Sequence, residues 1–132
     1  MSGRLGGMTN TATASFTVDG WEPQATDKPE STEFSRVSLT KTFTGDVEGT
    51  SAVEMLTAVN VTSSAYVAFE RLAVTVDGRK GGFVLHHSAG ENGHHLIVLP
   101  GSGHGELAGL TGTAEIVKDD EGNHTFTLTY EL

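Results

Sequence analysis

The sequence predicts an all-β protein, a closed antiparallel up-and-down barrel of about eight strands. Apolar and polar residues alternate with a period of two along most of the chain, and turn-forming residues separate the alternating stretches at short intervals. Glycine is abundant, with 17 in 132 residues. A barrel is favoured over a sandwich because the alternation extends into both terminal strands, and closure removes exposed strand edges.

The alternating stretches begin where Ala12, Ala14, Phe16 and Val18 share one parity, with polar residues between them. Further stretches contain Val37, Leu39 and Phe43; Tyr66, Ala68, Leu72, Val74 and Val76; Phe83 and Leu85; Leu96 and Val98; and Phe126, Leu128 and Tyr130. Residues 51–59 have a weak helical pattern but lie between strand-like stretches, so we expect a strand there.

Turn residues connect these segments. Gly45-Asp46 and Asp77-Gly78 are typical of tight hairpin turns, whereas residues 88–93 and 119–123 indicate longer hairpin loops. Residues 100–112 form one long glycine-rich connection. It lacks the Lys-Ser/Thr ending and the following helix of a phosphate-binding loop, so we interpret it as a barrel corner.

Length and composition favour one domain at residues 12–132, preceded by a flexible tail at residues 1–11. The absence of cysteine excludes disulfides and thiolate metal sites. A formal charge of -9 argues against nucleic acid as a partner. No apolar run has the length of a signal peptide or a membrane span, so we expect a soluble cytoplasmic protein without a membrane partner.

Hairpin parity predicts which polar residues face the interior. A two-residue loop at Asp77-Gly78 pairs Glu70 with Leu85, and a four-residue loop pairs Glu70 with His87. Both registers place Glu70 and His87 on one face. That face also carries Tyr66, Phe83 and Leu85 and is therefore the better candidate for the interior.

Four histidines flank the next loop. A six-residue loop at residues 88–93 would pair His87 with His94 on the inner face and His86 with His95 on the outer face. Adjacent histidines point to opposite faces of a strand, so no more than two of the four converge. We therefore expect hydrogen-bonded or solvated histidines, and neither a metal site nor a cofactor.

The register at Gly45-Asp46 decides the position of two more carboxylates. If Thr44 pairs with Val47, Glu48 and Glu54 lie on the inner face with Leu39 and Phe43. A three-residue loop would reverse this assignment.

A carboxylate enclosed by apolar side chains has a raised pKa unless a proton or a cation is shared with it, and it can then act as a general acid or base. The alternative is structural: Glu70 pairs with Arg71, Lys41 or a buried backbone donor.

Several motifs together resemble a known family. They are SLTKTFTGDVEGTSAVEML at 38–56, AFERLAVTVDGRKGGFVLHHSAG at 68–90, VLPGSGHGELAGLTG at 98–112 and the terminal TLTYEL. The chain from residue 12 is similar to the bacterial family of small uncharacterised proteins with an allene-oxide-cyclase-like barrel. The resemblance implies a closed barrel with an internal cavity and self-association, and it marks Glu48, Glu70 and the glycine-rich loop as motif positions. It implies no established reaction, and His86, His94, His95 and His104 depart from the family pattern.

These observations lead to two hypotheses of function. The first is a cofactor-independent cyclase, isomerase or lyase that acts on a small apolar molecule in the lumen. Glu70 or Glu48 would move a proton with His87 as partner, and the ligand would contact Tyr66, Phe83, Leu85, His94, Leu39, Phe43 and Glu54. The second is a non-catalytic binding or carrier barrel; a purely structural role follows if side chains fill the interior.

The outward parity of the central strands is also apolar. Val67, Phe69, Val84, Ile97 and Leu99 share it. A patch of this kind predicts self-association, most simply as a homodimer.

Overall fold

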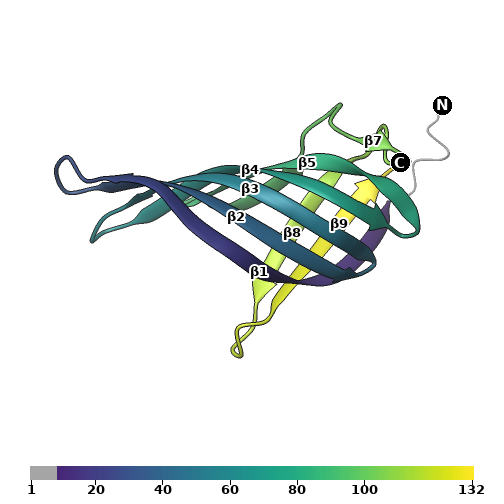
Figure 1. Ribbon diagram of the computed structural model, residues 1–132, viewed down its shortest axis with the longest axis horizontal. Helices are drawn as coiled ribbons and strands as arrows, with labels where there is room; N and C mark the ends of the chain where they lie inside the picture. The colour runs from purple at the N-terminus through teal and green to yellow at the C-terminus, as the bar shows by residue number, and fades with distance from the viewer. Residues whose placement is uncertain (1–8) are drawn as a thin grey trace.

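The computed structural model describes residues 9–132, which form nine β-strands and no helix (Figure 1). The strands are β1 (Asn10–Asp27), β2 (Glu33–Gly45), β3 (Val47–Val59), β4 (Ser64–Val76), β5 (Arg79–Gly90), β6 (Gly93–Val98), β7 (His104–Gly105), β8 (Thr111–Lys118) and β9 (His124–Glu131). None of the described residues forms a helix long and apolar enough to span a membrane. The tail expected at residues 1–11 lies mostly outside the described residues, and β1 already begins at Asn10.

Eight strands close into an antiparallel barrel, as the sequence predicted. The strands are hydrogen-bonded in the order β4-β3-β2-β1-β9-β8-β6-β5, and pairing between β4 and β5 closes the ring. Each strand pairs with the next barrel strand along the chain, and the first pairs with the last, which is the up-and-down arrangement. The short β7 lies outside the ring and pairs with β5. The expected strand at residues 51–59 is part of β3.

The β4–β5 turn has the tighter of the two predicted forms. Val76 pairs with Arg79, so the loop contains only Asp77 and Gly78. Both loop residues have positive φ, 49° and 86°, as a type I′ hairpin turn requires. The resulting register pairs Glu70 with Leu85 and Leu72 with Phe83.

The β2–β3 turn has the opposite parity to the one expected, and the inward placement of Glu48 and Glu54 is wrong. Phe43 pairs with Gly49 and Lys41 with Ser51, so an odd number of residues separates the paired positions. An odd connection exchanges the two faces of the following strand. Glu48 and Glu54 are consequently exposed on the outer face.

A bulge in β1 changes which parity faces inward. Phe16 pairs with Phe43 and Val18 with Lys41, but Gly20 then pairs with Thr40 and Trp21 with Leu39, leaving Asp19 as the extra residue. The Asp19 carboxylate accepts hydrogen bonds from the hydroxyls of Thr17 and Thr42. The bulge places Trp21 on the inner side, opposite to what uninterrupted alternation predicts.

One end of the barrel is filled by side chains. Phe43, Phe83 and Phe126 are completely buried there, and the rings of Phe43 and Phe126 meet edge to face with centroids 5.2 Å apart. The glycine-rich connection folds over this end and inserts Leu107 and Leu110 into the same core. The predicted corner is therefore a plug.

The plug lies directly against β5. A Cβ atom on Gly81 would lie 2.1 Å from the carbonyl oxygen of His104, so only glycine allows this approach. The Glu106 carboxylate accepts a hydrogen bond from the Lys80 amide, and the Glu106 amide donates to the Lys80 carbonyl.

The side chains of Tyr130 and Asp77 connect β9 to the β4–β5 turn at the filled end. The Tyr130 hydroxyl donates to the Asp77 carboxylate. Burial, and then this hydrogen bond, raise the pKa of Tyr130 to about 12, so the hydroxyl keeps its proton at neutral pH.

We predict that Tyr130→Phe lowers the free energy of unfolding by about 1–2 kcal/mol, because it removes one hydrogen bond to a charged group and leaves the ring in place. Urea unfolding measures this difference. Tyr130→Phe combined with Asp77→Asn should cost little more than Tyr130→Phe alone; additive losses would contradict the coupling.

Self-association stays a prediction, and the outer face of β4 and β6 supports it. Phe69 is 52% exposed, Val67 48% and Ile97 49%, and Leu99 is also exposed; Val84 is partly buried. We expect wild-type protein to be dimeric in light scattering and Phe69→Ser to shift it toward the monomer. Val61→Ser, at the exposed tip between β3 and β4, is the matched control. A wild-type monomer at micromolar concentration would contradict the prediction.

Candidate functional site

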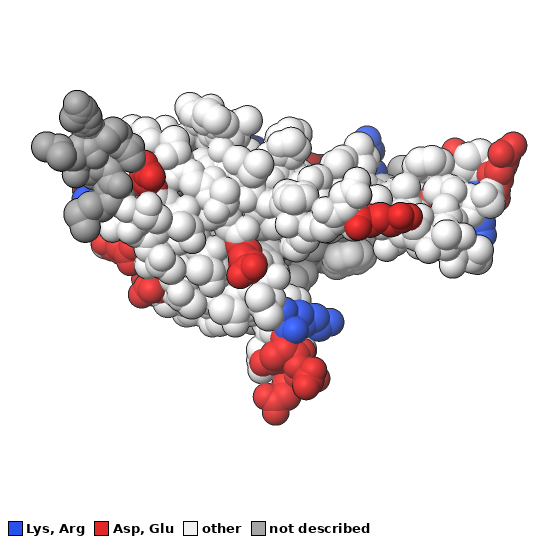
Figure 2. Space-filling model, turned by 180° about the vertical axis from the view of Figure 1, so that it is seen from behind, with Lys and Arg blue, Asp and Glu red and all other residues white. Residues whose placement is uncertain are grey.

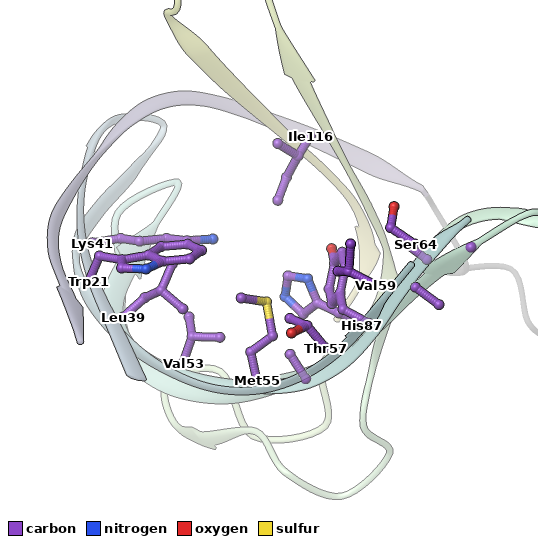
Figure 3. Close-up of a pocket in the computed structure, with 15 residues that line it drawn as sticks. Trp21, Leu39, Lys41, Val53, Met55, Thr57, Val59, Ser64, His87 and Ile116 are labelled. Carbon is purple, nitrogen blue, oxygen red and sulfur yellow. The ribbon is translucent and has the colours of Figure 1, made fainter. Parts of the chain in front are cut away.

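A cavity of about 580 Å³ occupies the lumen beyond the filled end (Figure 3). Trp21, Leu39, Lys41, Val53, Met55, Thr57, Val59, Ser64, Ala65, Tyr66, Ala68, His87, Ala89, Gly90 and Ile116 line it. Most of these side chains are apolar, and the volume is in the range of small-molecule sites. Side chains therefore do not fill the whole interior of the barrel.

A buried polar cluster lies beside this cavity, with Glu70 at its centre. Glu70 is completely inaccessible to solvent. Its Oε1 atom accepts hydrogen bonds from Lys41 Nζ at 3.3 Å and from His87 Nε2 at 2.8 Å. Its Oε2 atom accepts a hydrogen bond from Ser51 Oγ at 2.6 Å. The cluster satisfies both carboxylate oxygens.

Four consecutive strands supply these residues: Lys41 from β2, Ser51 from β3, Glu70 from β4 and His87 from β5. Lys41 and Ser51 are directly paired, whereas Glu70 pairs with Val53 and Leu85. Ser51 and His87 therefore reach Glu70 diagonally, from positions displaced by two residues on the neighbouring strands. Lys41 reaches it across β3.

The cluster favours the ionised form of Glu70. Burial by itself raises the pKa of a carboxyl group. The hydrogen bond from His87, the charge of Lys41 and the hydrogen bond from Ser51 act in the opposite direction and together lower the pKa of Glu70 below its ordinary value. Lys41 is a cation that interacts with this carboxylate, so the rise in pKa expected from burial is outweighed. The structural alternative correctly named Lys41 as a partner.

The ionised Glu70 fixes the tautomer of His87. A carboxylate has only acceptors, so the 2.8 Å contact requires that Nε2 of His87 carries the proton. Among residues 9–132, the other ring nitrogen, Nδ1, has no protein hydrogen-bond partner. His87 lines the cavity, whereas Glu70 does not. Of these two residues, the one that faces the cavity is therefore His87.

A second polar pair is formed by Tyr66 and His94. The Tyr66 hydroxyl and His94 Nε2 are 2.8 Å apart. Burial, and then the nearby charge of Glu70, raise the pKa of Tyr66. Burial lowers the pKa of His94.

The histidine hairpin has the expected faces but a different loop. His94 pairs with Ala89 and His87 with Leu96, so the loop has two residues and not six. Both lengths are even, and His87 and His94 still share a face. His86 lies on the other face, where its ring stacks on Phe69.

The shortest strand pairing in the barrel wall lies close to His94. Strands β6 and β8 pair through only two positions, Leu96 with Ala114 and Ile97 with Thr113. A second cavity of about 470 Å³ lies here and includes His94 and Ile116 in its lining. Ile116 also lines the first cavity, so both reach this seam.

The residues expected to contact a ligand divide into three groups. Leu39 and Tyr66 line the main cavity, and His94 lines the second one. Phe43, Phe83 and Leu85 are completely buried in the filled end. Glu48 and Glu54 are on the outer surface.

The sequence did not predict Ser51 as a member of the polar cluster, nor Trp21, Val53, Met55 and Ile116 as residues that line the cavity. A signal existed in β3, where the odd positions Val47, Val53, Met55 and Val59 are more apolar than the even ones. No comparable signal marks Trp21, because the bulge at Asp19 reverses the pattern.

Metal coordination finds no support in residues 9–132, where no group of three or more His, Cys, Asp or Glu side chains could hold an ion. His87 and Glu70 already bind each other, and the cluster contains a lysine, which is not a ligand at neutral pH.

The fold and the cavity define a small all-β barrel with a ligand-sized lumen. The chain belongs to the DUF3224 family, described as a protein family of unknown function, whose sequence profile matches residues 12–130. A crystal structure from Shewanella oneidensis MR-1, a DUF3224 protein with unknown function, is similar, with a TM-score of 0.86 and 34% identity over 93% of this chain and 97% of that chain. A comparison with curated proteins gives no significant match.

The lowered pKa of Glu70 predicts a specific loss of stability in acid. Ionised Glu70 stabilises the folded state at pH values above the ordinary pKa near 4.5, and this stabilisation is lost as the pH falls through the lower folded value. We expect Glu70→Gln to have a lower free energy of unfolding than wild type at neutral pH. Plotted against pH, this free energy should converge on the wild-type curve in acid. Chemical unfolding across this pH range measures both curves.

Glu48→Gln is the matched control, because it removes the same charge from an exposed position. It should leave the acid limb of the curve unchanged. Parallel curves for Glu70→Gln and wild type would contradict the assigned direction of the pKa.

Proposed function

We propose that this barrel binds a small, mainly apolar molecule in its lumen and transfers a proton on it without a cofactor, as a cyclase, isomerase or lyase. The observation that carries the proposal is the His87 imidazole, which is oriented by a buried carboxylate and lines an apolar cavity. An oriented imidazole of defined tautomer is a suitable general base or acid at neutral pH.

The proposal assigns Glu70 and His87 roles that differ from those expected from the sequence. Glu70 has a lowered pKa and no access to the cavity, so it is a poor proton acceptor and serves as a positioning residue. His87 is the candidate catalytic residue, with Nδ1 as the atom that gains and returns the proton. Glu48 has no part in the proposal, because it is exposed on the outer face.

The environment of His87 suits this chemistry. Apolar walls allow the cavity to hold a flexible molecule in a reactive conformation. The Lys41 ammonium, which also lines the cavity, can stabilise negative charge that develops on the ligand when a C–H proton is removed.

A non-catalytic carrier is the second candidate function. It is favoured by the hydrogen bonds of Glu70, which are all satisfied within the protein, as in a stable structural cluster. In a carrier, a bound ligand is recovered unchanged and His87 affects only affinity.

The proton transfer can be tested before the substrate is known, with nitrobenzisoxazole as a probe. A base removes its C–H proton, the N–O bond breaks, and the coloured cyanophenolate forms without any other reactant. We expect the wild-type protein to accelerate this elimination above the buffer rate, and His87→Gln to lose roughly a hundredfold of the acceleration.

His86→Gln is the matched control, because this neighbouring histidine lies on the outer face of the same strand. It should retain wild-type activity, and thermal unfolding verifies that both variants are folded. Equal rates for His87→Gln and wild type, or no acceleration by the wild type, would refute the catalytic proposal and leave the carrier.

A further inference from the structure

Lys41 is the only Lys, Arg, Asp or Glu among the described residues that line the cavity. His87 lines it as well. Glu70 lies behind them with both oxygens engaged. The outer surface is different: acidic side chains lie along the barrel and at the hairpin tips in the face shown in Figure 2.

Lys41 has unused hydrogen-bonding capacity. An ammonium group has three N–H donors. One donates to Glu70, and the group also lies 4.4 Å from the centroid of the Phe16 ring. In the described part of the chain the ammonium has no other acceptor, and Figure 3 shows its nitrogen directed into the lumen.

His87 offers the complementary group. Its Nδ1 atom is an acceptor when Nε2 carries the proton that Glu70 binds. A charged donor and a neutral acceptor in one apolar cavity match the two oxygens of a carboxyl group, one bound to the ammonium and the other joined to Nδ1 through a shared proton.

We propose that the ligand is a small monocarboxylic acid with an apolar body, which binds with its carboxyl group on Lys41 and His87 and its body along the apolar walls. This inference rests on the proposed function, since it identifies the ligand class of the same site. A phosphate, which carries more charge, is disfavoured because Lys41 is the only Lys or Arg among the described lining residues.

The same arrangement predicts proton uptake. A carboxylic acid is ionised in neutral water, so the proton shared with Nδ1 must be taken from the buffer on binding. The other titratable or charged groups around the imidazole are Glu70 and Tyr66 on β4, Lys41 on β2 and His94 on β6. Affinity for the acid should therefore fall as the pH rises above neutrality.

The test compares three probes of equal chain length, octanoate, octan-1-ol and octylamine, with the full chain. Trp21, the only tryptophan, lines the cavity and reports binding by fluorescence; the Met55 methyl group gives an independent signal by NMR. We expect octanoate to bind at least about tenfold more tightly than octan-1-ol, and octylamine to bind most weakly. Calorimetry in buffers of different ionisation enthalpy should show uptake of about one proton with octanoate and none with octan-1-ol.

Variants test whether the preference for octanoate over octan-1-ol depends on Lys41 in the lumen. Lys41→Met leaves Glu70 buried without its cation, so the double variant Lys41→Met with Glu70→Gln is the principal one. It should lose the preference for octanoate and still bind octan-1-ol. Lys118→Met is the matched control, because it removes a lysine from an exposed position on β8.

The outcomes distinguish the two proposals. If octan-1-ol or octylamine binds as tightly as octanoate, or if the double variant keeps the preference, the carboxylic acid is refuted while lumen binding stands. If neither the Trp21 nor the Met55 signal responds to any probe, lumen binding of small apolar molecules fails, and the carboxylic acid fails with it.

Discussion

The burial of one negative charge determines how the inside of this barrel is organised. Glu70 is inaccessible to solvent, and an isolated carboxylate in such a position would be strongly destabilising. It is tolerated because Lys41, Ser51 and His87 donate to it from three different strands. The cluster therefore requires the register of four strands at once, and a shift of any one would leave a buried charge without a partner.

This cluster divides the lumen into two parts of different character. On one side, aromatic rings and the two leucines of the glycine-rich connection form a buried hydrophobic core. On the other side, a smaller set centred on Val37, Leu39, Val53 and Ala68 leaves a cavity. Two of the polar groups of the cluster, Lys41 and His87, face this cavity.

The sequence predicted the barrel and the Glu70–His87 face well, because those inferences needed only the parity of short even loops. The two-residue turn at Asp77-Gly78 and the two-residue loop before Gly93 both conserve that parity. The prediction from the sequence failed where a single additional residue reverses the faces of a strand. The odd connection around Asp46 places Glu48 and Glu54 on the outer face. The bulge at Asp19 places Trp21 on the inner face. The even connection assumed at this turn placed Glu48 inside and Ser51 outside, so the contact of Ser51 with Glu70 was not predicted.

The short seam between β6 and β8 has a consequence for the kinetics of the whole barrel. Elsewhere neighbouring strands are held by long ladders, but here only two residue pairs join the wall. Separating these two strands therefore breaks few backbone hydrogen bonds and leaves the Glu70 cluster, on the other strands, intact. The wall can therefore open at this seam on the timescale of local strand fraying, which is far faster than global unfolding.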